Sequence, residues 1–141
     1  MPLWKSPFTL SEIHQLTEKT LCRLLDIEIT EIGEDYLVAT MPVDARHHQP
    51  MGILHGGASV VLAESVGSIA SAMANRPGYY SVGLDVNANH IRAVHSGVVT
   101  AKATPVHIGR TTHVWNIAIS NEQGKPVCES RLTMSVLKGD N

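Results

Sequence analysis

The first third of the chain changes from a helical to an alternating pattern of apolar residues. Thr9 and Glu12 have the spacing of a capping box, and apolar residues recur every three to four positions behind them, which predicts an amphipathic helix over residues 10–25. From Ile27 to Met41 apolar and polar residues alternate on both sides of a turn at Gly33. Such alternation is typical of half-buried strands, so we expect a β-hairpin here.

A long apolar run occupies the middle of the chain. After a loop bracketed by two prolines, the segment from Ala58 to Ala74 contains only Ala, Val, Leu, Ile, Met, Ser and Gly apart from Glu64. An apolar composition on nearly every face is typical of a helix that is buried on all sides. We therefore expect a central helix, with Gly56 and Gly57 at its start.

The second half of the chain returns to alternation. Apolar residues alternate with polar ones over residues 82–94, 98–106, 114–119 and 127–137. Each stretch predicts a strand. One long helix after two strands, followed by four strands with short connections, predicts an α+β fold in which an antiparallel sheet wraps around the central helix. We expect one domain over residues 1–141.

Composition places the chain among soluble globular proteins. Hydrophobic residues make up 43% and charged residues 17%, and the net charge of −2 gives no sign of a nucleic-acid or anionic membrane partner. Cys22 and Cys128 are far apart and lack metal-ligand spacing, so we expect two reduced thiols. The start of the sequence has no secretory pattern and the apolar run carries Glu64, so we expect a cytoplasmic protein without a membrane segment.

Glu64 is the first candidate for chemistry. It is the only formal charge between Arg46 and Arg76, so no Lys or Arg of this segment can pair with it. Burying an unpaired carboxylate is costly in free energy. Ser68 lies one helical turn further on and can share its face. A Glu that merely bonds to backbone or water is the alternative, but the glycines and the histidine upstream favour a catalytic role.

Gly56 is the second candidate. At a helix start the unpaired N–H groups and the positive end of the helix dipole coincide, and a glycine leaves them accessible to a carbonyl or oxyanion. Gly56 and Glu64 lie eight positions apart, or roughly 12 Å along a helix. One helix cannot place both at the same carbonyl group. We therefore expect two antiparallel copies of the helix to share each site across a two-fold dimer.

Other kinds of site have less support. The eight histidines include no HxH or HExxH spacing, so we do not expect a metal site. The serines of the central run are not part of a G-x-S-x-G nucleophile elbow, which disfavours a serine hydrolase. The glycines from Gly52 to Gly57 lack the Lys-Ser/Thr ending of a phosphate-binding loop. We expect the chemistry to need neither a metal nor a cofactor.

Several motifs resemble one enzyme family. The run QPMGILHGG from Gln49 to Gly57, followed by LAESVGS from Leu62 to Ser68, is similar to the hotdog-fold acyl-CoA thioesterases of the phenylacetate-thioesterase type. The similarity extends from Trp4 to Leu137 and includes ATMPVD at 39–44, VNANH at 86–90 and SRLT at 130–133. Within that family the chain most resembles the 1,4-dihydroxy-2-naphthoyl-CoA hydrolases of menaquinone synthesis and the proofreading thioesterases of enterobactin synthesis. The resemblance implies a hotdog fold.

The resemblance also implies roles for individual residues. Glu64 is the implied general base or nucleophile, and the N–H of Gly56 polarises the thioester carbonyl. Gln49, His55 and Ser68 complete the implied catalytic group, because they position the acyl group, the helix-start donor or water. The implied contacts with the substrate and its CoA are Gly83, His90, Ile91, Arg92, Ala93, His107, Ile108, Gly109, Arg110, Thr111 and Thr112.

The turn that ends in Arg110 also has a physical reason to meet CoA. Gly109 would let backbone N–H groups approach an anion closely, and Arg110 can bind a phosphate through two N–H groups. For Arg92, at a strand end, solvated surface is the alternative interpretation.

We therefore expect hydrolysis of an acyl-CoA thioester with an aromatic acyl group, such as 1,4-dihydroxy-2-naphthoyl-CoA, to the free acid and CoA. The expected assembly is a dimer with shared sites, and a dimer of dimers as homotetramer. One alternative is a proofreading thioesterase that acts on carrier-protein thioesters, and another is a hotdog dehydratase or hydratase. A non-catalytic acyl-CoA-binding module is a further alternative, but it would not need the charge at Glu64.

Overall fold

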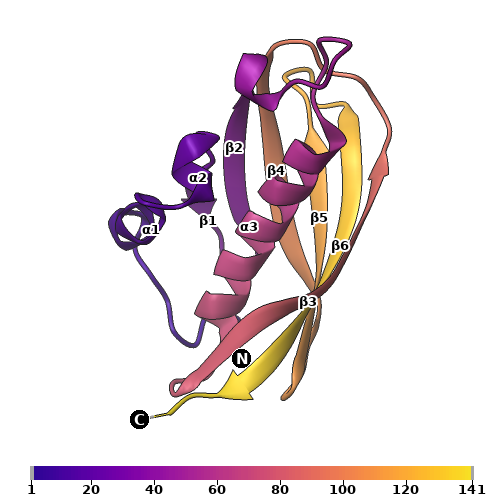
Figure 1. Ribbon diagram of the computed structural model, residues 1–141. Helices are drawn as coiled ribbons and strands as arrows, with labels where there is room; N and C mark the ends of the chain where they lie inside the picture. Colours follow the sequence, from indigo (N-terminus) through magenta and orange to yellow (C-terminus); the bar gives the residue numbers. More distant parts are fainter. Residues whose placement is uncertain (1, 141) are drawn as a thin grey trace.

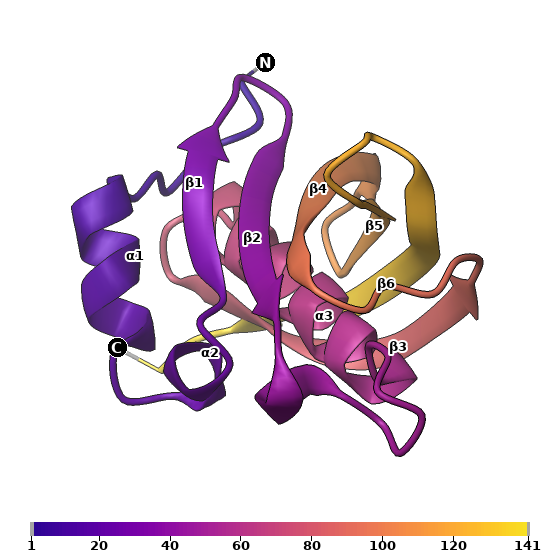
Figure 2. The same cartoon turned by 90° about the horizontal axis from the view of Figure 1, so that it is seen from above.

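The computed structural model describes residues 2–140. In chain order the elements are α1 (Leu10–Thr17), α2 (Leu21–Leu24), β1 (Glu28–Ile32), β2 (Leu37–Val43), the 3₁₀ turn η1 (Ala45–His47), α3 (Gly56–Ala74), β3 (Tyr79–His90), β4 (Gly97–Ile108), β5 (Thr112–Ser120) and β6 (Pro126–Lys138). Neighbouring strands are antiparallel, in the order β1-β2-β4-β5-β6-β3. The sheet curves around α3, and α1 and α2 lie beside β1 (Figures 1 and 2). The predicted α+β fold is confirmed.

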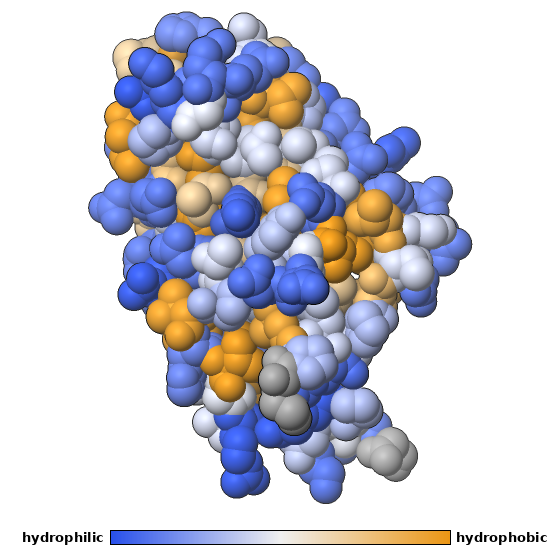
Figure 3. Space-filling model, turned by 180° about the vertical axis from the view of Figure 1, so that it is seen from behind, coloured by the Kyte–Doolittle hydropathy of each residue, from blue (hydrophilic) through white to orange (hydrophobic). Residues whose placement is uncertain are grey.

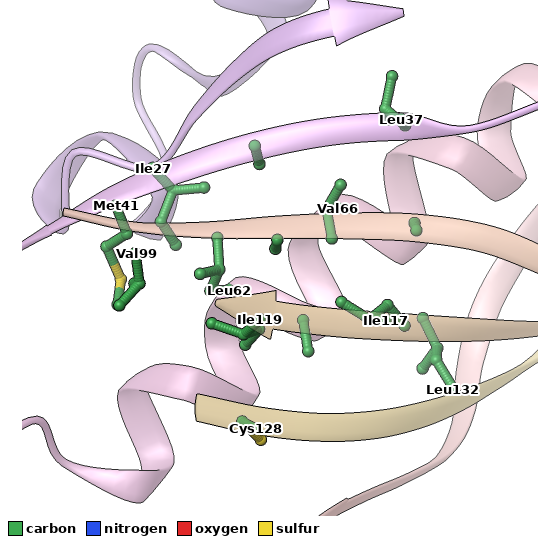
Figure 4. Packing of buried hydrophobic residues seen from close by; sticks show 14 of the residues in the cluster. Ile27, Leu37, Met41, Leu62, Val66, Val99, Ile117, Ile119, Cys128 and Leu132 are labelled. Carbon is green, nitrogen blue, oxygen red and sulfur yellow. The ribbon is translucent and has the colours of Figure 1, made fainter. Parts of the chain in front are cut away.

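The hydrophobic core lies between α3 and the inner face of the sheet. Leu62 and Val66 of α3 are fully buried in one cluster with Ile117 and Leu132 of the sheet (Figure 4). Burying a side chain of this size stabilises the fold by about 1.5–3 kcal/mol. Gly67 brings the helix close to β6, because a Cβ at this position would lie 2.5 Å from Leu132 Cδ2.

α3 is also the one helix within residues 2–140 that is long and apolar enough to cross a membrane by length and composition. Half of the residues in this apolar stretch are buried inside the fold. Packing against the sheet therefore accounts for much of the apolar character that the sequence shows.

The single helix expected over residues 10–25 is wrong in part. The capping box of Thr9 and Glu12 starts α1 as predicted, but α1 ends at Thr17 and a separate turn, α2, follows. The Thr17 hydroxyl donates to Ile13 O at 3.1 Å, and the Thr20 hydroxyl donates to Thr17 O at 2.7 Å. Hydroxyls that bond nearby carbonyls compete with helix propagation, so the chain turns between the two threonines.

The expectation that α3 is buried on all sides is wrong for the single chain. The side of α3 that faces the sheet is buried, whereas Val61, Glu64, Ser68 and Ala72 are only half-buried. These positions are three or four residues apart, so they form one stripe along the helix. The sheet wraps only part of the helix, and this stripe is where a second chain or a ligand can approach.

The strand expected over residues 82–94 starts earlier and ends at His90. The N–H groups of Ile91 and Arg92 both donate to Val127 O, at 2.8 and 3.3 Å, which interrupts the ladder with β6. Val94 O then accepts the Leu54 N–H at 2.8 Å. Residues 91–94 therefore form a loop that joins the end of β3 to the loop before α3.

β3 forms one edge of the sheet and has no partner on its outer side in the single chain. Its apolar side chains Tyr80, Val82 and Leu84 are 49%, 46% and 69% exposed. An exposed apolar edge strand is a surface that another strand or chain usually covers. Seen from the side away from α3, apolar residues appear instead as separate spots among hydrophilic and neutral ones (Figure 3).

Candidate active site

The loop before α3 is held to the N-terminal part of the chain. Arg46 Nη2 lies 2.9 Å from Asp44 Oδ2, and its Nη1 lies 3.0 Å from Asp26 Oδ2. The hydrogen bonds from Arg46 hold the pKa of Asp44 well below its usual range. The buried His47 ring donates from Nε2 to Leu25 O at 2.8 Å. These contacts fix the direction in which the chain enters the next turn.

Gln49 sits in that turn and offers one end of its side-chain amide. The Gly52 N–H donates to Gln49 O at 2.9 Å, and Gly52 has the positive φ of +74° that favours glycine. Gln49 Oε1 accepts the N–H of Met51. Since the oxygen is used within the turn, the NH₂ group is the part of Gln49 that can contact a ligand.

His55 caps the start of α3. Its N–H donates to His47 O at 2.7 Å, and its Nδ1 accepts the Gly57 N–H at 2.8 Å. The ring proton of neutral His55 therefore lies on Nε2. Within residues 2–140 the N–H of Gly56 has no hydrogen-bond partner. A free N–H at the positive end of the helix dipole is a donor for a carbonyl oxygen.

Gly56 also allows a close approach by His90. A Cβ at position 56 would lie 2.9 Å from His90 Nε2, so a larger residue would push the ring away. Gly56 and His90 line a pocket of about 330 Å³ at the start of α3. The other predicted site residues that line it are Gln49, Ile91, Arg92 and Ala93. The structure thus brings together residues from two distant parts of the sequence.

Arg92 is anchored at the edge of this pocket. Its Nη1 donates to Pro126 O at 2.8 Å, while the side chain stays exposed. Its remaining N–H groups form no hydrogen bond within the described residues and can bind an anion.

Glu64 lies apart from this pocket, on the half-buried stripe of α3. Its carboxylate rests against Gly83 of β3, where a Cβ would lie 2.5 Å from Oε2. No other side chain in the described part of the chain forms an ion pair or a hydrogen bond with Glu64. Ser68 shares the stripe as predicted, but its hydroxyl contacts Met134 Sδ at 3.8 Å rather than the carboxylate. Glu64, Ser68 and Gly83 form a second group.

The turn between β4 and β5 forms a third group. Gly109 donates its N–H to Thr112 O at 2.8 Å, so this N–H closes the turn. The prediction that it is free to bind an anion is therefore wrong. A Cβ at Gly109 would lie 2.5 Å from His107 Nε2, so a larger residue would require the His107 ring to move. Thr111 O accepts the Val136 N–H at 2.9 Å, which ties the turn to β6. Ile108, Gly109 and Arg110 line a small pocket near the C-terminal end of α3.

A buried polar network beside this turn was missed in the sequence. Trp115 Nε1 donates to Ser71 Oγ at 2.6 Å, and Ser71 Oγ lies 3.0 Å from His113 Nδ1. Ser71 Oγ accepts from Trp115, and the direction of its bond with His113 Nδ1 depends on which ring nitrogen of His113 carries the proton. Burial lowers the pKa of His113 to about 4. The alternation of β5 could have shown that His113 faces inward with Trp115.

A larger pocket, about 540 Å³, lies elsewhere, between the N-terminal helices and the β1–β2 hairpin. Its lining mixes charges of both signs, such as Arg23, Asp26 and Glu28, and includes none of the predicted site residues. Within residues 2–140 no three His, Cys, Asp or Glu side chains gather as metal ligands would. The predicted site residues offer a carboxylate, helix-start N–H donors, imidazoles and an amide.

Comparison with known proteins defines the class. The family model of the thioesterase superfamily matches residues 51–128, which include Gly56, Glu64 and the end of β3. The chain belongs to the thioesterase superfamily, and it is a thioester hydrolase with the hotdog fold.

Particular relatives cover nearly the whole chain. The 1,4-dihydroxy-2-naphthoyl-CoA hydrolase of Escherichia coli (strain K12) is 46% identical over 135 residues, which are 96% of this chain and 98% of that protein. The proofreading thioesterase EntH of Cronobacter turicensis is also 46% identical over 135 residues, with the same coverage of both chains. A crystal structure of a thioesterase from Haemophilus influenzae has a TM-score of 0.94 and 52% identity, and the match covers 96% of this chain and 95% of that one.

Proposed function

We propose that the protein hydrolyses an aromatic acyl-CoA thioester, such as 1,4-dihydroxy-2-naphthoyl-CoA, to the free acid and CoA. The observation that carries this proposal is the pairing of two incomplete groups along α3. Glu64 is a carboxylate with no cation beside it, and Gly56 offers an unused N–H at the helix start. A base or nucleophile and a carbonyl donor are the two parts that thioester hydrolysis needs.

The two groups meet across a two-fold axis in the proposed dimer. Along one helix they are roughly 12 Å apart, which is too far for one carbonyl group. The unpaired edge of β3, with the exposed Val82 and Leu84, supports an antiparallel pairing of two chains along this strand. Such a pairing would cover the half-buried stripe that holds Glu64. A dimer of dimers extends this proposal, and measurement of the mass in solution tests it.

In the proposed reaction the Gly56 N–H polarises the thioester carbonyl, with the His55 cap keeping the helix start in shape. On the general-base route, Glu64 takes a proton from water, the oxygen attacks the carbonyl carbon, and the C–S bond breaks. Glu64 then returns the proton to the CoA thiolate. On the nucleophilic route, a Glu64 oxygen attacks the carbon directly, the thiolate leaves, and water hydrolyses the mixed anhydride.

The remaining predicted residues take binding roles in the proposal. The Gln49 NH₂ group faces the acyl or water side of the pocket, and Ser68 positions water or the carboxylate. His90 and Arg92 line the path of the CoA arm. The turn of residues 107–112 contacts the nucleotide end, with Arg110 as the cation.

The acyl group and its carrier are the finer part of the proposal. The E. coli relative is named for 1,4-dihydroxy-2-naphthoyl-CoA, which favours an aromatic acyl-CoA and a role in menaquinone synthesis. The Cronobacter relative is named a proofreading thioesterase, so a carrier-protein thioester is the second candidate. Both cysteines of the described chain are free thiols, which suits action in the cytoplasm.

The test is release of free thiol from a panel of aryl-CoA, fatty acyl-CoA and carrier-protein thioesters, with wild type, Glu64→Gln and the matched exposed control Glu34→Gln. We expect Glu64→Gln to keep its fold and substrate affinity while kcat falls about 10²-fold or more. Glu34→Gln should match wild type. A loss of less than about tenfold in Glu64→Gln would remove Glu64 from the reaction. Binding of acyl-CoA without turnover by wild type would identify a non-catalytic module.

A further inference from the structure

A small pocket at the C-terminal end of α3 is lined by positively charged side chains. Its volume is about 120 Å³, and Lys5, Arg76 and Arg110 reach it from three separate segments. None of these cations forms an ion pair with a residue of the described chain, and no Asp or Glu lines the pocket. Like charges held together without a counterion raise the electrostatic free energy, so a bound anion would stabilise this arrangement.

The Arg76 guanidinium and the backbone beside Lys5 are held in place before any ligand arrives. Arg76 Nη2 donates to Arg110 O at 3.2 Å, and its guanidinium carbon lies 4.1 Å from the centre of the Tyr79 ring. Next to Lys5, Ser6 is anchored to the end of α3 by an N–H···O bond of 2.9 Å and a hydroxyl bond of 2.7 Å. A site that is ordered in advance loses less entropy when it binds.

The inner wall of the pocket includes the imidazole of His113. Within residues 2–140 its Nε2 has no hydrogen-bond partner, so in the tautomer that carries the proton there it can donate to an anion. Burial is the main cause of its lowered pKa, and the charges of Lys5 and Arg76 lower that pKa further. Their influence on His113 indicates that positive potential extends into the pocket.

We propose that this pocket binds a phosphate group of the CoA substrate, with Arg76 and Lys5 acting together with Arg110. This inference rests on the proposed function and adds two binding residues to it. Asn75, which also lines the pocket, follows Glu64 by eleven residues, or ~16 Å and about three turns on the same side of α3. The pantetheine arm has about as many bonds as four residues of extended chain, or up to ~14 Å. This length is comparable to the distance along α3, so a thioester held at Glu64 can bring its diphosphate to this end of the helix.

The test compares acyl-CoA, acyl-dephospho-CoA and acyl-pantetheine as substrates. In Arg76→Ala we expect KM for acyl-CoA to rise about tenfold while kcat stays within about twofold, because a phosphate contact binds ground state and transition state alike. KM for acyl-pantetheine should not change. Lys5→Ala should show a smaller rise, about threefold, and Arg76→Lys should fall between wild type and Arg76→Ala. The matched control is Lys125→Ala, an exposed cation in the β5–β6 turn.

The dephospho substrate shows which phosphate is bound. If Arg76→Ala affects acyl-dephospho-CoA as strongly as acyl-CoA, the pocket holds the diphosphate, and if the effect disappears, it holds the 3′-phosphate. Inorganic phosphate should compete with acyl-CoA and leave acyl-pantetheine hydrolysis unchanged. Inhibition by free phosphate that Arg76→Ala abolishes, without any change in KM for acyl-CoA, would instead assign the pocket to inorganic phosphate and overturn the proposal.

Calorimetric binding of CoA separates this proposal from the proposed reaction. If no thioester is hydrolysed but CoA affinity falls about tenfold in Arg76→Ala, the reaction is wrong and the pocket stands. If turnover occurs but Arg76→Ala and Lys5→Ala both match Lys125→Ala in KM and in CoA affinity, the pocket is wrong and the reaction stands. Thermal unfolding of each variant checks the fold, and Arg76→Lys with Lys5→Ala carries the test if Arg76→Ala unfolds.

Discussion

Glu64→Ala and His55→Ala should each inactivate the enzyme, yet a mixture of the two should recover about a quarter of wild-type activity. The prediction follows from the length of α3 between the two groups. A carbonyl oxygen needs its donor at about 3 Å, and the attacking water or carboxylate must lie equally close to the carbon. A separation of roughly 12 Å along the helix exceeds both reaches together, so Glu64 and the His55-capped helix start must act from different chains.

The arithmetic is that of a dimer with two shared sites. Random mixing of equal amounts gives about half mixed dimers. In a mixed dimer one site carries both substitutions and the other carries neither. One working site in half of the dimers is about a quarter of all sites.

The assay unfolds and refolds the two variants together, confirms mixed dimers by mass spectrometry, and measures thiol release. A mixture of Glu64→Ala with Glu64→Gln is the control, because no exchange can restore the carboxylate. If the His55→Ala mixture contains mixed dimers and stays as inactive as its parents, each site is built within one chain. The carbonyl donor would then have to be sought elsewhere than at Gly56.

Three further predictions test single contacts. Gly83→Ala would place a Cβ 2.5 Å from Glu64 Oε2 and push the carboxylate aside. We expect kcat to fall about tenfold or more in steady-state kinetics, with a change in the free energy of unfolding below ~1 kcal/mol. An unchanged kcat would show that the position of the carboxylate does not matter. Arg92→Ala should raise KM for acyl-CoA more than for acyl-pantetheine, and equal effects on both would make Arg92 ordinary surface. The folded pKa of His113, about 4, lies below its unfolded value of 6.5, so unfolding takes up a proton. The free energy of unfolding should therefore fall by up to ~3 kcal/mol as the pH drops from 7 to 4. Denaturant titrations of wild type and His113→Gln should differ between these pH values, and parallel pH profiles would contradict the assignment.

Local patterns in the sequence were enough to predict the elements and the fold class. The capping box at Thr9, the helix start at Gly56 and the alternation of β4, β5 and β6 all involve neighbours within a few residues. Periodicity reports which side of an element is buried, and that is sufficient to predict a sheet wrapped around a helix. Periodicity did not predict where β3 ends or that the first helix is divided into α1 and α2. The hydrogen bonds to Val127 and the contacts of the threonine hydroxyls cause these breaks, and neither leaves a trace in the spacing of apolar residues.

The candidate site could likewise be predicted only in part from the sequence. Glu64 could be singled out from the sequence because a lone charge in an apolar run needs a physical reason. The contact of His90 with Gly56, and that of Gly83 with Glu64, depend on how the sheet folds over α3 and join residues far apart in the chain.

Only the tertiary structure decided which charges gather. Lys5, Arg76 and Arg110 are separated by long stretches of sequence, and nothing in their spacing indicates a common pocket. The network of Ser71, His113 and Trp115 likewise exists only because α3 packs on β5. Patterns along a chain record interactions between near neighbours and the side of each element that is buried, whereas a site depends on where several elements place their side chains relative to one another in space.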